Sequence, residues 1–177
     1  MHKIPLRLGF QILGILPMTL VLVGCGGSQS AQKSAHKDMP MLLGWVERSD
    51  VQSPAYAWFD SVYSAYKPHA EMLRDNRAML DSVEFTIIFG TWCGDSKREV
   101  PQFFKILDSL DVLDPHVRLC GVDRAKGQSD SIRSAYNIER VPTFIVRQHG
   151  EEIGRFIESP KTSLEVDLFE ILMHIPR

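Results

Sequence analysis

The sequence has 177 residues, which is enough for one ordinary domain and a short appendage. Hydrophobic residues make up 44% and charged residues 24%, and the net charge of −2, without any run of lysine or arginine, excludes a typical nucleic-acid-binding surface. The three cysteines, Cys25, Cys93 and Cys120, are too few and too unevenly spaced for a disulfide framework or a zinc site.

The first 24 residues are typical of an export signal. A short basic stretch precedes the uncharged run 8–23, which is 16 residues long and includes Gln11 and Pro17. A helix that crosses a hydrocarbon core of roughly 30 Å needs about 20 apolar residues, so this run is short for a permanent anchor. An ordinary secretory signal with an incidental cysteine, or a weak transmembrane anchor, is the alternative interpretation.

Cys25 follows this run directly. The segment Leu22-Val23-Gly24-Cys25 is similar to the bacterial lipobox, in which the cysteine is acylated and becomes the new N-terminus. We therefore expect residues 1–24 to be a lipoprotein signal peptide and Cys25 to be the lipidation site. Residues 25–40 would then be a lipidated, flexible tether of small and polar residues. The expected location is the bacterial cell envelope, with the protein anchored to the membrane by its N-terminal lipid and facing the periplasm.

Residues 41–82 form an N-terminal extension of mostly helical pattern. Trp45 and Val46 suit either a strand or a cover for a sheet edge. From Pro54 the apolar spacing becomes helical, with Ser53 as the expected cap. We interpret the apolar stripe of this helix as core packing: Phe59, Val62, Tyr63 and Tyr66.

Strands and helices then alternate along residues 83–173. Phe85 to Phe89 is typical of a strand buried on both faces, and a helix kinked at Pro101 is expected from about Ser96 to Leu110. The other predicted elements are a strand at 117–122, a short helix at 132–136, a hairpin of 143–146 and 153–157 around His149-Gly150, and a closing helix over 164–172. This order predicts an α/β fold with a central mixed sheet flanked by helices.

Cys93 lies between the buried strand and the following helix. The first N–H groups of a helix lack partners and its dipole is positive at that end, so a thiolate there is stabilised. Lys97 and Arg98 would add to this effect, and Asp95 would oppose it. We therefore expect Cys93 to be the reactive centre.

Four landmarks, in order, resemble the thioredoxin superfamily. They are Trp92-Cys93-Gly94 after a buried strand, Pro101 eight residues after the cysteine, Val141-Pro142-Thr143 preceded by Asn137-Ile138, and the turn at Gly150. The resemblance covers residues 83–173 and implies a thioredoxin-like domain over 41–177, with 41–82 as its N-terminal extension. In that family the proline bond is cis and faces the nucleophilic sulfur. The resemblance thus implies that Trp92, Val141 and Pro142 shape a substrate groove beside Cys93.

Three departures from the family pattern bear on function. Ser96 occupies the position of the second, resolving cysteine, and a serine alcohol cannot release a mixed disulfide by internal attack. Ile87 occupies the place of a buried acid that in many relatives is thought to help deprotonate the resolving thiol. Glu158 stands where many relatives have a glycine beside the groove, so its charge would restrict which peptides approach.

Cys120 falls in a predicted strand, where a buried cysteine is usually a small inert hydrophobe. The alternative is a remote resolving thiol, which requires the α-carbons of Cys93 and Cys120 to approach within ~7 Å. The run Cys-Gly-Asp-Ser is also similar to the Cys-Gly-Phe-Ser of monothiol glutaredoxins, but Trp92 and the landmark spacings favour the thioredoxin pattern. We therefore expect no cofactor and no metal.

The leading hypothesis is a thiol–disulfide oxidoreductase or isomerase that acts by a monothiol mechanism. Cys93 would attack a disulfide of a protein or peptide in the envelope, while Ser96 and nearby backbone N–H groups hydrogen-bond its sulfur. An external thiol reductant would then release the product. Because two catalytic groups of the family are missing, a redox-inactive module that binds peptides or proteins is the alternative.

Overall fold

The computed structural model describes residues 40–112, 114–124 and 130–174. The predicted signal peptide 1–24, the lipidation site Cys25 and all of the tether except Pro40 lie outside the described residues. None of the described helices combines the length and the apolar character that crossing a membrane requires.

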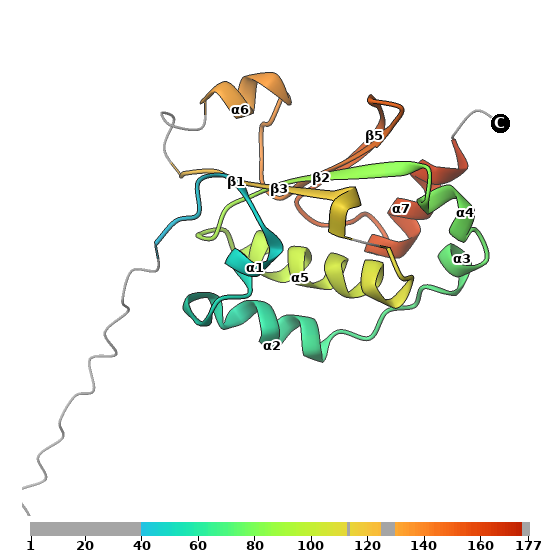
Figure 1. Cartoon of the computed structure of the whole chain (residues 1–177), viewed down its shortest axis with the longest axis horizontal. Helices are drawn as coiled ribbons and strands as arrows, with labels where there is room; N and C mark the ends of the chain where they lie inside the picture. The colour runs from blue at the N-terminus through green and yellow to red at the C-terminus, as the bar shows by residue number, and fades with distance from the viewer. Residues whose placement is uncertain (1–39, 113, 125–129, 175–177) are drawn as a thin grey trace, which may run out of the picture. The chain divides into compact units, whose positions relative to one another are not determined.

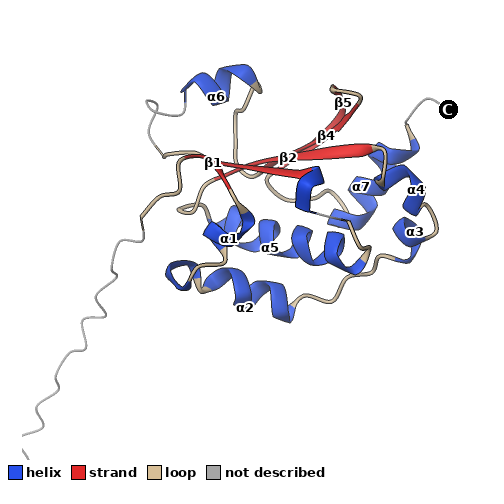
Figure 2. Cartoon of the chain, in the orientation of Figure 1, coloured by secondary structure: helices blue, strands red, loops and turns tan. Residues whose placement is uncertain are grey.

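Five strands form one mixed sheet in the order β1-β3-β2-β4-β5 (Figures 1 and 2). Their bounds are Gly44–Val46 for β1, Val83–Phe89 for β2, Val117–Gly121 for β3, Thr143–Gln148 for β4 and Glu151–Ile157 for β5. β2 and β3 are parallel, and the other neighbouring pairs are antiparallel. The predicted mixed sheet is confirmed. Trp45 and Val46 belong to an edge strand, so part of the N-terminal extension joins the sheet.

Helices cover both faces of this sheet. Their bounds are Arg48–Val51 for α1, Trp58–Ala65 for α2, Glu71–Arg74 for α3, Arg77–Leu80 for α4, Gly94–Ser109 for α5, Asp130–Ala135 for α6 and Leu164–Met173 for α7. α6 lies on the opposite side of the sheet from α5 and α2 (Figure 1). The helix expected from Pro54 instead begins at Trp58, after a 3-10 turn at Pro54–Tyr56. α5 continues through Pro101.

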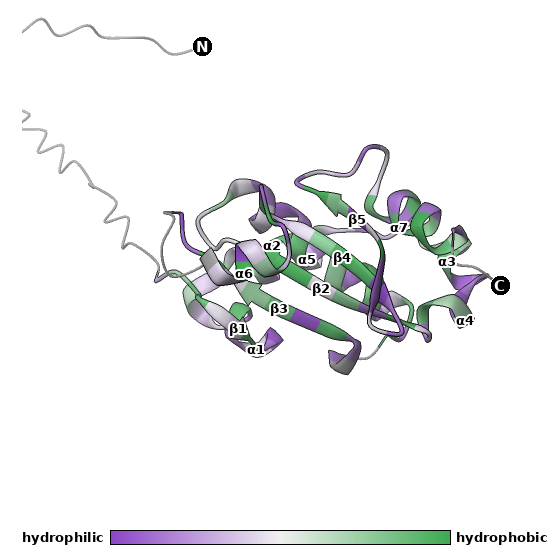
Figure 3. Ribbon diagram, turned by 90° about the horizontal axis from the view of Figure 1, so that it is seen from above, coloured by the Kyte–Doolittle hydropathy of each residue, from purple (hydrophilic) through white to green (hydrophobic). Residues whose placement is uncertain are grey.

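The alternation of side chains along the strands divides the core into two clusters. Phe85, Ile87 and Phe89 of β2 face α5 and belong to the larger cluster, together with Phe103 and Phe144. Ile88, which alternates with them on β2, belongs to a smaller cluster on the α6 side. The members of this cluster are Ile88, Cys120, Val122, Ile138, Val141 and Ile145. Figure 3 shows the hydrophobic colour along β2 and much of β4. The burial of β2 on both faces agrees with its nearly continuous apolar sequence.

The hairpin of β4 and β5 turns at His149 and Gly150, as predicted. Both residues have positive φ, 52° and 84°, which is the backbone form of the tightest hairpin turns. Glycine reaches this form without steric cost, and this explains its place in the turn.

The N-terminal extension is held on α5 by both aromatic and charged contacts. The rings of Phe59 and Phe104 lie 5.9 Å apart, and the Arg48 guanidinium lies 4.5 Å from the centroid of the Phe104 ring. Arg48 donates a hydrogen bond of 2.8 Å to Asp108, and Tyr63 donates one of 2.6 Å to the same carboxylate. Burial alone would raise the pKa of Asp108, but the hydrogen bonds from Arg48 and Tyr63 outweigh it and hold this pKa below its usual value.

Replacing Arg48 tests this attachment. We expect Arg48→Met to lower the free energy of unfolding by about 1.5–3 kcal/mol, because charge-assisted hydrogen bonds are lost while the apolar stem over Phe104 is kept. Urea denaturation followed by circular dichroism measures the difference. Arg77→Met is the matched control, since its ion pair with Asp81 is largely exposed and exposed pairs contribute about 0–1 kcal/mol. Equal losses in the two variants would contradict this view of Arg48.

Candidate functional site

Cys93 is the residue that caps the N-terminus of α5. Its backbone is extended, with φ −86° and ψ 129°, and its N–H donates to the Gly90 carbonyl at 2.9 Å. Its own carbonyl accepts from the N–H of Lys97 at 3.1 Å, which starts the helix. The side chain is partly exposed. The thiol therefore stands where the unpaired N–H groups and the positive dipole end of a 16-residue helix meet solvent.

Trp92, the neighbour of Cys93 in the chain, is held in place by contacts around its indole ring. Its indole Nε1–H donates to the carbonyl of Val122 at 2.9 Å. A Cβ added to Gly90 would lie 2.7 Å from the indole, so only glycine leaves room for the ring there. The Arg124 guanidinium lies 5.1 Å from the ring centroid. Trp92 thus forms a rigid aromatic wall for the site.

The second segment of the site is Val141–Pro142, joined by a cis peptide bond. The Cys93 thiol donates to the Val141 carbonyl at a distance of 3.2 Å. The Pro142 carbonyl accepts the backbone N–H of Glu158 at 2.7 Å, which ties this segment to the end of β5. Trp92, Val141 and Pro142, which the resemblance assigned to a groove, therefore lie around Cys93.

Glu158 has the left-handed backbone conformation, with φ 62°, that glycine would adopt more easily. Its carboxylate forms an ion pair of 2.9 Å with Arg140. We expected the negative charge of Glu158 to restrict which peptides approach, and in the structure this charge is paired with Arg140. Arg140 drew no attention in the sequence, since nothing in the local pattern links residues 18 positions apart.

Ser96 is fully buried in the first turn of α5, and the partner of its hydroxyl differs from the expected one. Its hydroxyl accepts the N–H of Gly90 at 3.1 Å. We expected this hydroxyl to bond the Cys93 sulfur, but the partner recorded for it among the described residues is Gly90. The reason is geometric: Ser96 stands in the first turn of α5, below the loop from β2, where the Gly90 N–H needs an acceptor. Ser96 therefore closes the loop that carries the thiol.

Arg98 is engaged by acidic neighbours rather than by the thiol. It forms ion pairs of 2.7 Å with both Asp95 and Glu99, and a hydrogen bond of 2.7 Å with Ser159. Burial raises the pKa of Glu99, and the bond from Arg98 only partly opposes this. The expected positive contribution of Arg98 at Cys93 is therefore largely compensated by its own partners.

Cys120 is fully buried in β3, beside Ile88 of β2. Burial raises the pKa of its thiol to about 11. Cys93 and Cys120 are both free thiols, although Cys93 packs against the cluster that contains Cys120. This environment agrees with the expectation that Cys120 is a small, inert, buried residue. Across the described ranges no group of His, Cys, Asp or Glu side chains is arranged to hold a metal ion.

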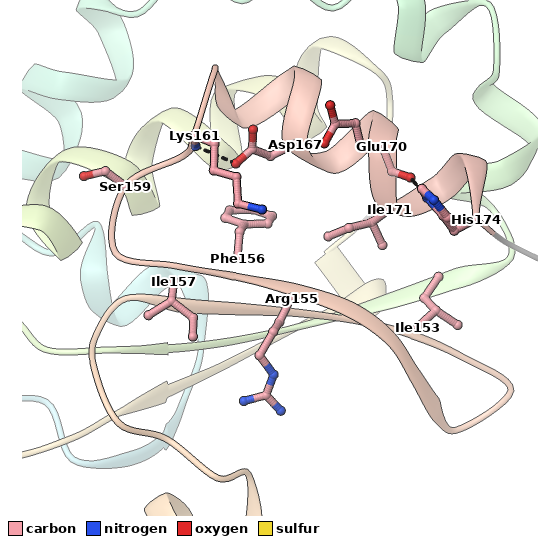
Figure 4. Close-up of a pocket in the computed structure, with 10 residues that line it drawn as sticks. All are labelled: Ile153, Arg155, Phe156, Ile157, Ser159, Lys161, Asp167, Glu170, Ile171 and His174. Atoms are coloured by element: carbon pink, nitrogen blue, oxygen red, sulfur yellow. Dashed lines mark hydrogen bonds between the residues drawn. The ribbon is translucent and has the colours of Figure 1, made fainter.

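A separate cavity of about 410 Å³ opens between β5 and α7 (Figure 4). Ile153, Phe156 and Ile171 supply apolar lining, and the Asp167 carboxylate accepts the backbone N–H of Lys161 at 2.8 Å. Cys93 is not among the lining residues. The cavity is therefore no part of the thiol site.

The sequence of the chain is similar to those of a thioredoxin and a thioredoxin-like protein. No family model matches the chain. The thioredoxin-like protein R548 of Acanthamoeba polyphaga mimivirus is 29% identical over 82 residues, which cover 46% of this chain and 57% of that protein. Mitochondrial thioredoxin-3 of Saccharomyces cerevisiae is 32% identical over 79 residues, 44% of this chain and 56% of that protein. The chain thus spans little more than half the length of these relatives.

Thioredoxins are also among the solved structures that resemble the chain. Oxidised mitochondrial thioredoxin 3 of Saccharomyces cerevisiae aligns with 23% identity and a TM-score of 0.39, over 62% of this chain and 98% of that chain. Fasciola hepatica thioredoxin aligns with 22% identity and a TM-score of 0.38, over 57% and 88%. The sequence relatives, the ordered landmarks and the mixed five-stranded sheet together support a fold of the thiol–disulfide oxidoreductase type and an assignment to the thioredoxin superfamily.

Proposed function

We propose that the protein catalyses thiol–disulfide exchange through one thiol, Cys93. The observation that carries this proposal is the partly exposed Cys93 sulfur at the start of α5, 3.2 Å from the carbonyl of Val141. A substrate peptide that runs beside Val141 and Pro142 brings its disulfide to this sulfur. Trp92, next to Cys93 in the chain, is held in place by its bond to the Val122 carbonyl.

The reaction has two exchange steps. In the first, the Cys93 thiolate attacks one sulfur of a substrate disulfide, a Cys93–substrate disulfide forms, and the other substrate sulfur leaves as a thiolate. In the second, the thiolate of an external or substrate cysteine attacks the mixed disulfide, forms a new disulfide with the substrate sulfur, and releases Cys93 as a thiolate. No net oxidant is consumed, so the cycle isomerises or transfers disulfides.

Three features favour a route with one thiol. Ser96 supplies an alcohol, already engaged by Gly90, where a second thiol would release the mixed disulfide. Ile87 is fully buried and apolar, so no acid at this position assists a second deprotonation. Cys120 is enclosed in the core, where burial keeps its thiol protonated near neutral pH. Release of the product therefore falls to a thiol from outside the chain.

The alternative of a redox-inactive binding module is not favoured. Cys93 keeps its place at the helix start and its contact with the Val141 segment, and the relatives in sequence are thioredoxins. A module that only docks peptides has no need of a thiol with this environment.

We also place the protein in the bacterial cell envelope as part of this proposal. The support is the sequence of residues 1–25 alone, with its short apolar run and the lipobox-like Leu22-Val23-Gly24-Cys25. Acyl chains on Cys25 would hold the protein at the bilayer, facing the periplasm. The substrates would then be thiols and disulfides of envelope proteins or peptides.

The two core-domain thiols should differ sharply in reactivity. In the native protein near neutral pH, iodoacetamide is expected to label Cys93 and to leave Cys120 unlabelled, because burial both shields Cys120 and raises its pKa to about 11. Peptide mapping by mass spectrometry resolves each site, and labelling in denaturant serves as the control for Cys120. Native labelling of Cys120 at the rate of Cys93 would refute the assignment.

Removing each thiol in turn distinguishes the nucleophile, Cys93, from the packing residue, Cys120. Cys93→Ser should reduce the rate of exchange with a fluorescent mixed-disulfide peptide to the rate measured without protein, because the attacking sulfur is gone. Cys120→Ala should retain the exchange rate, since its thiol takes no part in either step. Circular dichroism checks the fold of both variants. Undiminished exchange by Cys93→Ser would disprove the proposed chemistry.

Restoring a second thiol should add a reductase activity. The unmodified protein is expected to reduce insulin inefficiently with dithiothreitol as donor, and Ser96→Cys to reduce it faster, because an internal thiol can release the mixed disulfide. The turbidity of precipitating insulin chains reports the rate. Ser96→Ala is the control without a new thiol, and leaving the Gly90 N–H unpaired should cost it about 1–3 kcal/mol of stability. Insulin reduction by the unmodified protein at the rate of a two-cysteine thioredoxin would overturn the monothiol mechanism.

A further inference from the structure

Three large apolar side chains are exposed at the start of the described chain: Met41 by 46%, Leu43 by 39% and Trp45 by 43%. We call them the N-terminal stripe. They alternate with Leu42 and Val46, which pack against the core. Several large apolar side chains exposed within one short segment are typical of a surface that contacts a second apolar phase.

The N-terminal stripe lies at the end of the sheet that carries Cys93. Gly44 of β1 pairs with Gly121 of β3, and Gly121 pairs with Phe89 at the end of β2, four residues before the thiol. A Cβ on Gly121 would lie 2.2 Å from the Leu42 carbonyl oxygen, so the stripe segment crosses directly over this point. Figures 1 and 2 show the chain reaching β1 at the end of the sheet where α5 begins.

The side chains around Trp45 are of the kind found at membrane surfaces. The Arg118 guanidinium lies 4.1 Å from the centroid of the Trp45 ring, and the Tyr136 ring meets Trp45 edge-on at 5.8 Å. Tryptophan and tyrosine are enriched where hydrocarbon meets headgroups, and an arginine beside them keeps its charge among the headgroups. The stripe therefore fits an interface that is apolar on one side and polar on the other.

The segment that precedes the N-terminal stripe indicates that a lipid bilayer is the surface the stripe contacts. Cys25, the proposed lipidation site, is separated from Pro40 by 15 peptide links. Fifteen residues span at most about 50 Å even when fully extended, so an acyl chain on Cys25 would keep the stripe within reach of the bilayer. Such a tether gives an effective concentration on the order of mM, at which even a weak contact forms.

We propose that Met41, Leu43 and Trp45 rest on the bilayer surface and turn the Cys93 end of the domain toward the membrane. This inference rests on the proposed lipid anchor. The lipid supplies the affinity, and the stripe supplies the orientation. The substrates are then disulfides of membrane-attached proteins, close to the bilayer, rather than disulfides of free polypeptides.

The test uses the full chain, lipidated in cells and reconstituted into vesicles of phosphatidylethanolamine and phosphatidylglycerol with brominated acyl chains. Bromine quenches tryptophan emission only on close approach, so the protein should lose fluorescence relative to vesicles without bromine. Trp92 stands beside Cys93 and is partly exposed, so the test is made in a Trp92→Phe background. In that background Trp45→Phe should abolish this lipid-dependent quenching, whereas Trp58→Phe should retain it. Met41→Ser with Leu43→Ser should weaken it, and circular dichroism checks the fold of each variant.

The outcomes separate the two proposals. A lipidated, vesicle-bound protein whose Trp45 is not quenched overturns the orientation alone. Mass spectrometry that finds no acyl chain on Cys25 overturns the anchor, and the orientation with it, while thiol exchange by Cys93 stands unaffected. Quenching that survives Trp45→Phe places the lipid contact elsewhere and also overturns the inference.

Discussion

The hydrogen bond from the Cys93 thiol to the Val141 carbonyl joins two segments that are 48 residues apart in the chain. Each segment is held independently. On one side the loop from β2 is closed by Ser96 and Gly90, and α5 begins at Cys93 itself. On the other side Pro142 is tied to Glu158 at the end of the β4–β5 hairpin. The site exists because these two supports bring a thiol and a peptide edge within hydrogen-bonding distance.

Ser96, in the place of the second thiol, does more than leave a thiol out of the site, because its hydroxyl takes on a structural hydrogen bond. The Ser96 hydroxyl accepts the hydrogen bond of the Gly90 N–H. The position six residues before Cys93 is occupied by the buried apolar Ile87. Both changes remove groups that would release the mixed disulfide within the chain, and both leave the position of the attacking Cys93 sulfur intact. Such a site suits exchange that is completed by a partner's thiol.

Features of the fold that depend on local period and turn chemistry could be read from the sequence. The buried β2, the helix after Cys93, the turn at His149-Gly150 and the closing helix all follow from patterns within one segment. The landmark order placed Val141 beside the thiol, and the Val141 carbonyl lies 3.2 Å from the Cys93 sulfur; the role of Trp92, Val141 and Pro142 in binding a substrate stays a prediction. The hydrophobic pattern of a helix or strand predicts which face of that element a residue lies on.

Partners across long separations could not be predicted, because a pattern does not say which side chain on another element completes a contact. Arg48 finds Asp108 at a separation of 60 residues, and Arg140 finds Glu158 at 18. The bond from Gly90 to Ser96 was missed for a different reason. It depends on how the loop approaches the helix, and we assigned the serine by analogy with the cysteine it replaces.

The most direct test of the account is the fate of the mixed disulfide. The full chain, with Cys25→Ser to remove the third thiol, is mixed with an excess of an oxidised peptide disulfide, the free reagent is removed, and the intact mass is followed over time. The account predicts one peptide adduct on Cys93 that persists until an external thiol is added. Spontaneous loss of the adduct, with a Cys93–Cys120 disulfide found by peptide mapping, would show that the chain resolves its own intermediate and would contradict the monothiol mechanism.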